Sequence, residues 1–185
     1  MYKLKSVSKL TLILISVVLL FSSCGITDPI VVKVKEKYSI DLPWGSMPSK
    51  NLNSAASLEY SLPGTDYFIY VIDESKEAFK KTLVDNKITE QFSNNLEGYT
   101  SLALLNIKNK LKEAKVSEIK DIKINNLNAK KAEMKGKING VDLYYSITSI
   151  QGKDSYYQII SWRKDKSDFE RKEAMDNAIF TFKEL

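Results

Sequence analysis

The chain of 185 residues contains no histidine and only one cysteine, Cys24. Histidine is the commonest general base and a frequent zinc ligand, so its absence removes Ser-His and Cys-His nucleophile pairs and most zinc sites. A single cysteine allows no disulfide within the chain. The seven glycines form neither a G-x-G-x-x-G motif nor a P-loop. These absences predict a protein that is not an enzyme and that carries no cofactor.

Carboxylates are the one catalytic chemistry that the composition leaves open. Asp165, Asp168 and Glu170 lie close together in the sequence and could supply oxygen ligands for Ca²⁺, but their spacing is not that of an EF-hand loop. Glu170 has another explanation, because Ser167 stands three residues before it and the two form a capping box at the start of a helix. We therefore predict no metal site. A hydrolase that uses carboxylates without histidine is kept as a third functional hypothesis.

The N-terminus has the layout of an export signal. Three lysines and no acid occur in the first nine residues, and the twelve residues of 10–21 carry no charge. A charged region followed by a short apolar region is typical of a secretory signal. A membrane-spanning helix needs about 18 or more apolar residues, and this run is shorter. The pattern favours a signal that is removed over a stable membrane anchor.

The signal ends at the single cysteine, in the run Phe21-Ser22-Ser23-Cys24. Small residues directly before a cysteine resemble the lipobox of bacterial lipoproteins, although Phe21 stands where that motif usually has leucine. The resemblance implies a diacylglycerol on the Cys24 thiol, fatty acids such as palmitate, and cleavage before Cys24. It also implies a lipid-anchored protein of the cell envelope, at the inner or the outer membrane. The alternatives are an ordinary reduced cysteine behind an uncleaved anchor, or a signal that is cut elsewhere.

The chain is expected to hold one folded domain behind this anchor. We predict a signal at 1–23, a tether at 24–37 and a single α+β domain at 38–185. Removal of the signal would take three lysines and no acid, so the net charge would fall from +5 to +2. A nucleic-acid-binding domain keeps a strong excess of positive charge. Nucleic acid is therefore not an expected partner.

Strands are predicted in two groups, one before and one after a pair of helices. The stretch YSIDLPW alternates Tyr38, Ile40 and Leu42 with polar residues and ends at a proline, which is typical of a strand. The runs SLEYSL (57–62) and YFIYVID (67–73) flank a Pro-Gly turn and predict a hairpin. Every residue of Tyr67–Ile72 is aromatic or aliphatic, so both faces of this strand are expected to be covered. Further strands are predicted, from β-branched and aromatic content, at 116–124, 129–138, 141–150 and 155–163. Asn139-Gly140 predicts a type I′ hairpin turn, and Gln151-Gly152-Lys153-Asp154 predicts the next turn, so the last three of these strands are expected to form a meander.

Three helices are predicted from caps and periodicity. Asp73 is expected to cap a helix of about Glu74–Val84 that buries Phe79 and Leu83. A second helix is predicted over Leu96–Ala114, where apolar positions follow a spacing of three and four. A third helix is expected near the end of the chain, with Met175, Ala178, Ile179 and Phe182 as its buried stripe.

This order of elements resembles the PsbP-like family. The likeness is carried by the opening YSIDLPW, by the middle helix pair, by LNAKKAEMKGKINGVDLYYSITSIQGKDSYYQIISWR and by the closing AIFTFKEL. The resemblance implies an α/β/α sandwich, in which an antiparallel sheet of about six or seven strands has helices on both faces. Members of the family act by docking onto partners and share no catalytic site, so the resemblance supplies no site residues.

The aromatic and basic residues are the remaining binding candidates. Trp44 follows the strand-ending Pro43 in a loop, where an exposed tryptophan could anchor a partner protein. The runs KNKLKEAK and KKAEMKGK could contact anionic headgroups, although basic runs usually form a solvated face. A group of strand aromatics is expected to belong to the core rather than to a binding platform: Tyr144, Tyr145, Tyr156, Tyr157 and Trp162.

The leading hypothesis is therefore a non-enzymatic, lipid-anchored envelope domain that binds or stabilises a partner protein or complex at the membrane surface. The alternative is a carrier that holds a small hydrophobic or lipid ligand between the sheet and a helix. An apolar pocket with a few polar groups would favour the carrier. Paired carboxylates with perturbed pKa values in a cleft would favour the hydrolase.

Overall fold

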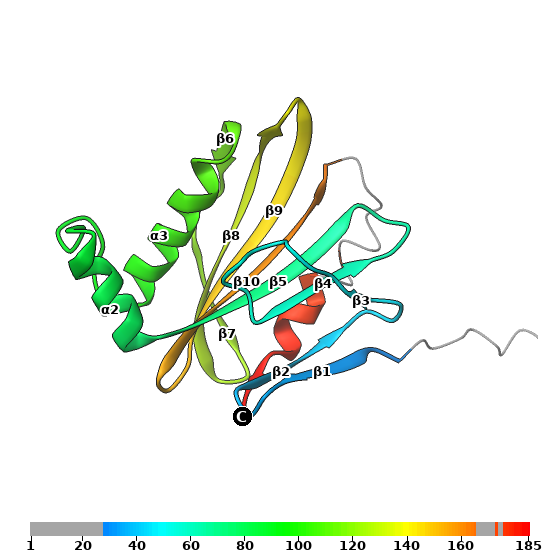
Figure 1. Ribbon diagram of the computed structural model, residues 1–185, viewed down its shortest axis with the longest axis horizontal. Helices are drawn as coiled ribbons and strands as arrows, with labels where there is room; N and C mark the ends of the chain where they lie inside the picture. Colours follow the sequence, from blue (N-terminus) through cyan, green and yellow to red (C-terminus); the bar gives the residue numbers. More distant parts are fainter. Residues whose placement is uncertain (1–27, 166–172, 174–175) are drawn as a thin grey trace, which may run out of the picture.

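The computed structural model describes residues 28–165, 173 and 176–185. Two antiparallel sheets form the fold (Figure 1). The larger has eight strands in the order β3-β4-β5-β10-β9-β8-β6, with β7 also paired to β8, and the smaller has the order β1-β2-β11. The strands are β1 (Ile30–Val34), β2 (Tyr38–Leu42), β3 (Met47–Pro48), β4 (Leu58–Leu62), β5 (Tyr67–Ser75), β6 (Lys112–Val116), β7 (Lys120–Ile124), β8 (Leu127–Ile138), β9 (Val141–Gln151), β10 (Ser155–Lys164) and β11 (Lys183–Glu184). The helices are α2 (Lys76–Asp85), α3 (Leu96–Lys108) and the 3₁₀ helix η1 (Ile179–Thr181).

The large sheet buries apolar side chains on both faces. On β5, Ile69 and Val71 pack toward the small sheet and η1, while Tyr70 packs toward α3. Because neighbouring side chains of a strand point to opposite faces, the continuous apolar run of β5 supplies both layers. The expectation that both faces of this strand are covered is confirmed.

The covering layers differ from the expected sandwich. Helices α2 and α3 lie over one face, whereas the small sheet and η1 pack on the other (Figure 1). Within the described residues the large sheet has eight strands rather than six or seven, and a second layer of helix over its other face is not supported. The physical reason is that β1 and β2 bring their own apolar stripe, including Tyr38 and Ile40, to the second face. The α+β class and the antiparallel sheet are as expected.

The strand β2 matches the predicted one residue for residue. Tyr38, Ile40 and Leu42 are fully buried. Its partner β1 lies in the stretch that was expected to be tether, so the tether ends before Ile30. The pattern in Ile30–Val34 alternates as a strand does, and pairing with β2 satisfies its backbone groups along one side.

The first helix begins later than predicted, and Asp73 is not its cap. Strand β5 continues to Ser75, because β10 pairs with it as far as Ser155. The hydroxyl of Ser75 accepts a hydrogen bond from the Ala78 N–H at 3.0 Å and caps α2. Asp73 instead forms an ion pair with Lys37. The predicted burial of Phe79 and Leu83 is confirmed.

The second helix is shorter than predicted. It ends at Lys108, and the residues that follow form β6, which pairs with β8. Leu111 is buried against Gly136 of β8, where a Cβ atom on the glycine would come within 2.9 Å of the Leu111 Cβ. Backbone pairing with β8 therefore replaces a further helical turn, and Ala114 lies on a strand.

The region predicted as one strand at 116–124 forms two. Strand β6 ends at Val116 and β7 begins at Lys120, and both pair with β8. The meander of β8, β9 and β10 is confirmed. Its first turn has the expected positive φ at Asn139 (52°) and at Gly140 (80°).

The C-terminal segment closes the core between the two sheets. Ala178, Ile179 and Phe182 are buried there, as predicted. The helical turn ends as η1, and β11 then pairs with β2. The capping box of Ser167 and Glu170, together with Met175, lies outside the described residues.

Candidate functional site

Cys24 lies outside the described residues, and its lipidation stays a prediction. The described chain begins at Asp28 and enters the fold at Ile30, the first residue of β1. Ile30 pairs with Leu42 at the end of β2. In the part of the chain that the structure describes, no helix is long and apolar enough to cross a bilayer.

The loop after β2 presents an exposed indole beside this point. The side chain of Trp44 is 64% exposed, and that of Met47 is 58% exposed. The loop is held by a hydrogen bond from the Ser46 N–H to the Pro43 carbonyl, 3.1 Å long, and by a positive φ of 82° at Gly45. The sequence singled out Trp44, and its exposure is consistent with a role in binding.

A shallow apolar groove lies next to this loop. It encloses about 250 Å³. Its lining comes from the start of the described chain, from the end of β2 and from the C-terminal segment: Pro29, Asp41, Leu42, Pro43, Asn177, Ala178 and Thr181.

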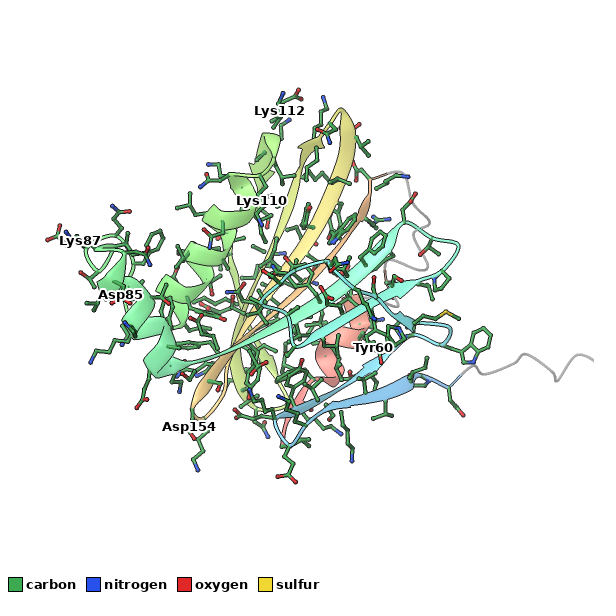
Figure 2. All side chains as sticks on the ribbon, viewed as in Figure 1. Tyr60, Asp85, Lys87, Lys110, Lys112 and Asp154 are labelled. Carbon is green, nitrogen blue, oxygen red and sulfur yellow. The ribbon has the colours of Figure 1, made fainter. Side chains whose placement is uncertain are left out.

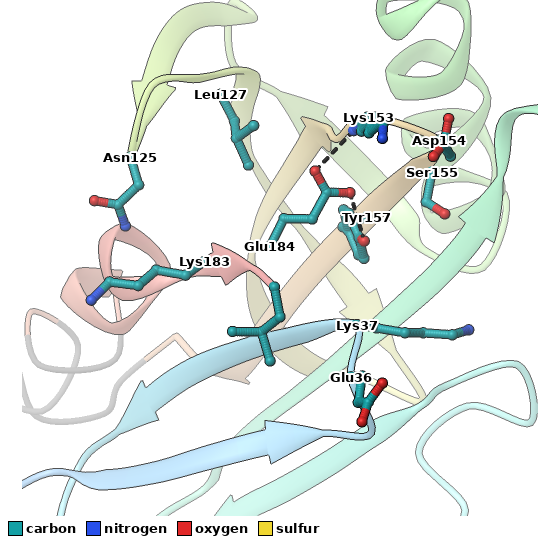
Figure 3. A pocket seen from close by; sticks show the side chains of 11 residues that line it. Glu36, Lys37, Asn125, Leu127, Lys153, Asp154, Ser155, Tyr157, Lys183 and Glu184 are labelled. Carbon is teal, nitrogen blue, oxygen red and sulfur yellow. Dashed lines mark hydrogen bonds between the residues drawn. The ribbon is translucent and has the colours of Figure 1, made fainter.

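A larger cavity of about 610 Å³ lies elsewhere, where the turn after β1 meets the turn after β9 and the C-terminal strand (Figure 3). Lys37, Lys153 and Lys183 line it, and so do the acids Glu36, Asp154 and Glu184. Three cations and three carboxylates give the lining no excess of one charge. This cavity left no signal in the sequence, because its residues come from four distant segments.

Glu184 is the central acid of this charged cavity. One carboxylate oxygen accepts a hydrogen bond from the Tyr157 hydroxyl at 2.9 Å, and the other accepts one from the Lys153 N–H at 2.8 Å (Figure 3). Burial raises the pKa of the Tyr157 phenol, and the neighbouring Glu184 raises it further. These contacts tie β11 to the turn between β9 and β10, so they explain Glu184 as a structural residue.

The strand aromatics belong to the packed interior, as expected. Tyr156 stacks on Tyr99 with ring centroids 4.7 Å apart. Trp162 is half-buried and stacks on Phe68 at 4.2 Å. The remaining members are also covered: Tyr144 (4% exposed), Tyr157 (3%) and the half-buried Tyr145. The strand aromatics therefore form core contacts and cross-strand pairs.

A polar patch interrupts the apolar face of the large sheet that points toward the small sheet. Arg163 is 6% exposed, and its guanidinium lies 5.1 Å from the ring centroid of Tyr144. The hydroxyls of Ser146 and Thr148 are buried and have no hydrogen-bond partner among the described residues. This patch was not predicted from the sequence, although the alternation of Tyr144, Ser146 and Thr148, which places all three on one face of β9, is a signal for it.

The acidic candidates have structural partners or lie outside the described residues. Asp165 forms an ion pair with Lys135 at 3.0 Å, and Asp168 and Glu170 are not described. Within residues 28–165, 173 and 176–185, no three cysteines or carboxylates stand close enough to hold a metal ion. Burial raises the pKa of Glu74, but Glu74 lines neither of the two cavities described above.

The first basic run lies far from the place where the chain enters the domain. Lys110 and Lys112 stand at the far end of α3, away from β1 (Figure 2). Both are exposed. The neighbouring Glu113 forms an ion pair with Lys137 of the second basic run at 2.7 Å. Lys130 of the second run instead pairs with Glu97 at 2.6 Å and with Asp121 at 2.7 Å, so the lysines of the two runs partly neutralise acids at different places on the surface.

Comparison with known proteins defines the fold. No protein-family model matches the chain, and no curated protein sequence does. Among solved structures, cyanobacterial PsbP (CyanoP) from Synechocystis sp. PCC 6803 is similar over 88% of this chain and 96% of its own, with a TM-score of 0.55 and 12% identity. LpqN of Mycobacterium tuberculosis is described as involved in cell envelope biogenesis. It is similar over 88% of this chain and 87% of its own, with a TM-score of 0.50 and 9% identity.

A eukaryotic protein shares the same architecture. The Saccharomyces cerevisiae Ran-binding protein Mog1p is similar over 85% of this chain and 95% of its own, with a TM-score of 0.50 and 11% identity. The chain also spans about half (48%) of a larger structure from Bacteroides thetaiotaomicron, which is 8% identical. At such identities the likeness concerns the fold alone. The fold is therefore PsbP-like.

Proposed function

We propose that this chain is a lipid-anchored protein of the cell envelope, whose domain binds or stabilises a partner protein or complex at the membrane surface without catalysis. The observation that carries the proposal is the run Phe21–Cys24, which follows a basic and then an uncharged segment. Fatty acid chains on Cys24 would hold the domain at a bilayer without further help, because a lipoprotein carries more than one chain.

The interior of the domain supports docking over transport of a ligand. Both faces of the large sheet are filled by side chains of the chain itself. The cavity of about 610 Å³ is lined by charged residues, which do not suit a hydrophobic cargo. The groove of about 250 Å³ is below the usual size of a ligand pocket, which is about 300–1,000 Å³. A hollow of about 360 Å³ between the start of α3 and strands β7 and β8 reaches that size, but Asp121 and Lys123 are among its lining residues, so it is not an apolar pocket.

The names of structural neighbours are consistent with this role. LpqN is described as involved in cell envelope biogenesis, and Mog1p as a Ran-binding protein. Both descriptions concern proteins that share only the fold with this chain, and fold does not determine function. They show that one PsbP-like architecture serves an envelope protein and a protein-binding one.

The experiment that tests the proposal is fatty-acid labelling of the Cys24→Ser variant in growing cells. We expect the wild-type protein to incorporate labelled fatty acid and to fractionate with membranes. The variant should lose both properties while its circular dichroism stays native. Ser23→Ala is the matched control, because it keeps a small residue before the cysteine and should still be labelled. Labelling that persists in Cys24→Ser would contradict the proposal.

The partner is tested by crosslinking in intact cells, followed by gentle detergent purification of the tagged protein. We expect the wild-type protein to retain a specific partner, and Cys24→Ser to lose it because the domain no longer stays at the membrane. Co-purification of a lipid or small molecule alone would favour the carrier instead.

A further inference from the structure

We propose that the loop between β2 and β3 seats Trp44 in the headgroup region of the bilayer and so fixes which end of the domain faces the membrane. The inference rests on the proposed function, since it needs the lipid on Cys24. It concerns orientation rather than attachment, because the fatty acid chains already supply the affinity.

First, the loop between β2 and β3 exposes its apolar side chains and is anchored at both ends. Leu42, just before the loop, is fully buried, and Met47 after it pairs with Ser61 of β4. The hydrogen bond from the Ser46 N–H to the Pro43 carbonyl closes the turn between them. Trp44 is therefore displayed by a backbone that is fixed at both ends, one end in each sheet.

The second step is the length of chain between the lipid and the fold. Six residue steps separate Cys24 from Ile30, and six extended residues span at most about 22 Å. Ile30 pairs with Leu42 across β1 and β2, a distance of about 5 Å between Cα atoms. A domain of this size is about 40 Å across. The tether is thus short enough to keep the end that carries Trp44 toward the bilayer.

The third step is the chemistry of the side chains at this end. Tryptophan is enriched at membrane interfaces, where its ring is apolar and its N–H can meet water and headgroups. Met47 and Val31, which are 58% and 60% exposed, add apolar surface near the place where the chain enters the fold. The flanking charges Asp28, Asp41 and Lys50 give this end no excess of positive charge, so it does not depend on anionic lipid.

The other exposed surfaces do not compete for this role. The exposed apolar residues Val84 and Leu105 lie on α2 and α3, away from β1 (Figure 1). Leu185 is also exposed, but its N–H bonds the Lys37 carbonyl, at the opposite end of the β1–β2 hairpin from Ile30. The others, Val116, Val141 and Phe180, are single exposed residues on separate elements. The basic end of the molecule, marked by Lys110 and Lys112, also lies away from β1 (Figure 2). Of the two occupants that an exposed tryptophan could have, a bilayer and a protein, the short tether favours the bilayer.

The test uses the full lipidated chain reconstituted into phosphatidylcholine vesicles that contain brominated phosphatidylcholine. Trp162→Phe leaves Trp44 as the only tryptophan and keeps an aromatic ring on Phe68. We expect the brominated lipid to quench Trp44 emission, and quenching by acrylamide from the water to be several-fold weaker than in Cys24→Ser/Trp162→Phe with the same vesicles. Trp44→Phe is the matched control, and its Trp162 should not be quenched by the lipid. If Trp162→Phe folds poorly, the difference between wild type and Trp44→Phe supplies the same signal.

The outcomes separate this inference from the proposed function. A chain that carries fatty acid and floats with the vesicles, but whose Trp44 stays open to acrylamide and unquenched by lipid, overturns the inference and leaves the anchor intact. Loss of a crosslinked protein from Trp44→Ala, with no quenching by lipid, shows a protein occupant instead and also overturns it. A chain without fatty acid on Cys24 contradicts the proposed function, and the inference fails with it.

Discussion

Truncation of Phe182 to alanine is expected to cost more stability than any other change in the C-terminal segment that we consider. The ring is fully buried. It stacks on Tyr38 of β2 with centroids 5.3 Å apart and lies 4.9 Å from the ring of Tyr157 on β10. Phe182 thus joins the C-terminal segment to both sheets, and its loss would open a cavity between them.

The magnitude follows from the size of the group removed. Replacing a fully buried phenylalanine by alanine costs about 3–5 kcal/mol, from lost transfer free energy and from the cavity. The free energy of unfolding of a whole domain is about 5–15 kcal/mol. At about 2–4 °C per kcal/mol for a chain of this length, the melting temperature should fall by roughly 6–20 °C. The Asn125 side chain donates to the backbone carbonyl of Phe182 at 2.8 Å, and that hydrogen bond survives the substitution.

Urea denaturation followed by circular dichroism measures the change in the free energy of unfolding. Phe180→Ala is the matched control, because Phe180 lies two residues earlier, is 46% exposed and also has a carbonyl that accepts from Asn125. We expect the control to lose less than about 1 kcal/mol. If Phe182→Ala loses no more than the control, the C-terminal segment does not belong to the cooperative core, and the reasoning is refuted.

Three further predictions concern contacts elsewhere. Gly152→Ala should lower the free energy of unfolding, measured in urea, by about 1–3 kcal/mol, because a Cβ atom would lie 2.1 Å from a carboxylate oxygen of Glu184. Adding Glu184→Ala should relieve part of this loss. If the losses of the two single variants simply add in the double variant, the clash is not the cause. Burial raises the pKa of Tyr157 above its ordinary value of 10.0, so the unfolded chain loses that proton first, and the contribution of Tyr157 to stability should be constant up to about pH 10 and be lost above it. Phenolate absorbance that titrates fully near pH 10 in a chain with native circular dichroism would contradict this. Asn95→Ala should cost about 1 kcal/mol of thermal stability, because the Asn95 side chain caps α3 by accepting a hydrogen bond from the Gly98 N–H at 3.0 Å. Asn94→Ala, at the exposed neighbouring residue, should cost little.

Local pattern predicted most of the strands of this protein. The alternation of Tyr38, Ile40 and Leu42 placed β2, and the apolar run of β5 correctly indicated a strand covered on both faces. The Asn139-Gly140 pair located the hairpin, because few residues tolerate positive φ at both central positions. These features depend on neighbours in the sequence, and the sequence was sufficient for them.

The errors arose where pairing with a distant strand competed with a local signal. Asp73 has the chemistry of a cap, but β10 extends β5 past it. Ala114 continues the helical spacing, but β8 takes that segment as β6. A nearer pairing was also missed: the segment at Ile30–Val34 was expected to be tether, and it pairs with the next strand, β2, across the turn at 35–37.

The features of the candidate site also fall into those that the sequence predicted and those that only the structure revealed. The sequence alone determined that the chain lacks histidine chemistry and that Trp44 follows a strand-ending proline, and it predicted an export signal that ends at Cys24. The tertiary structure decided that Trp44 is exposed beside the place where the chain enters the fold, and that Glu184 meets Tyr157 in a charged cavity. The reason is physical: composition and period act between neighbours along the chain, whereas exposure and cavities depend on which distant strands pair and which side chains then fill the space between the sheets.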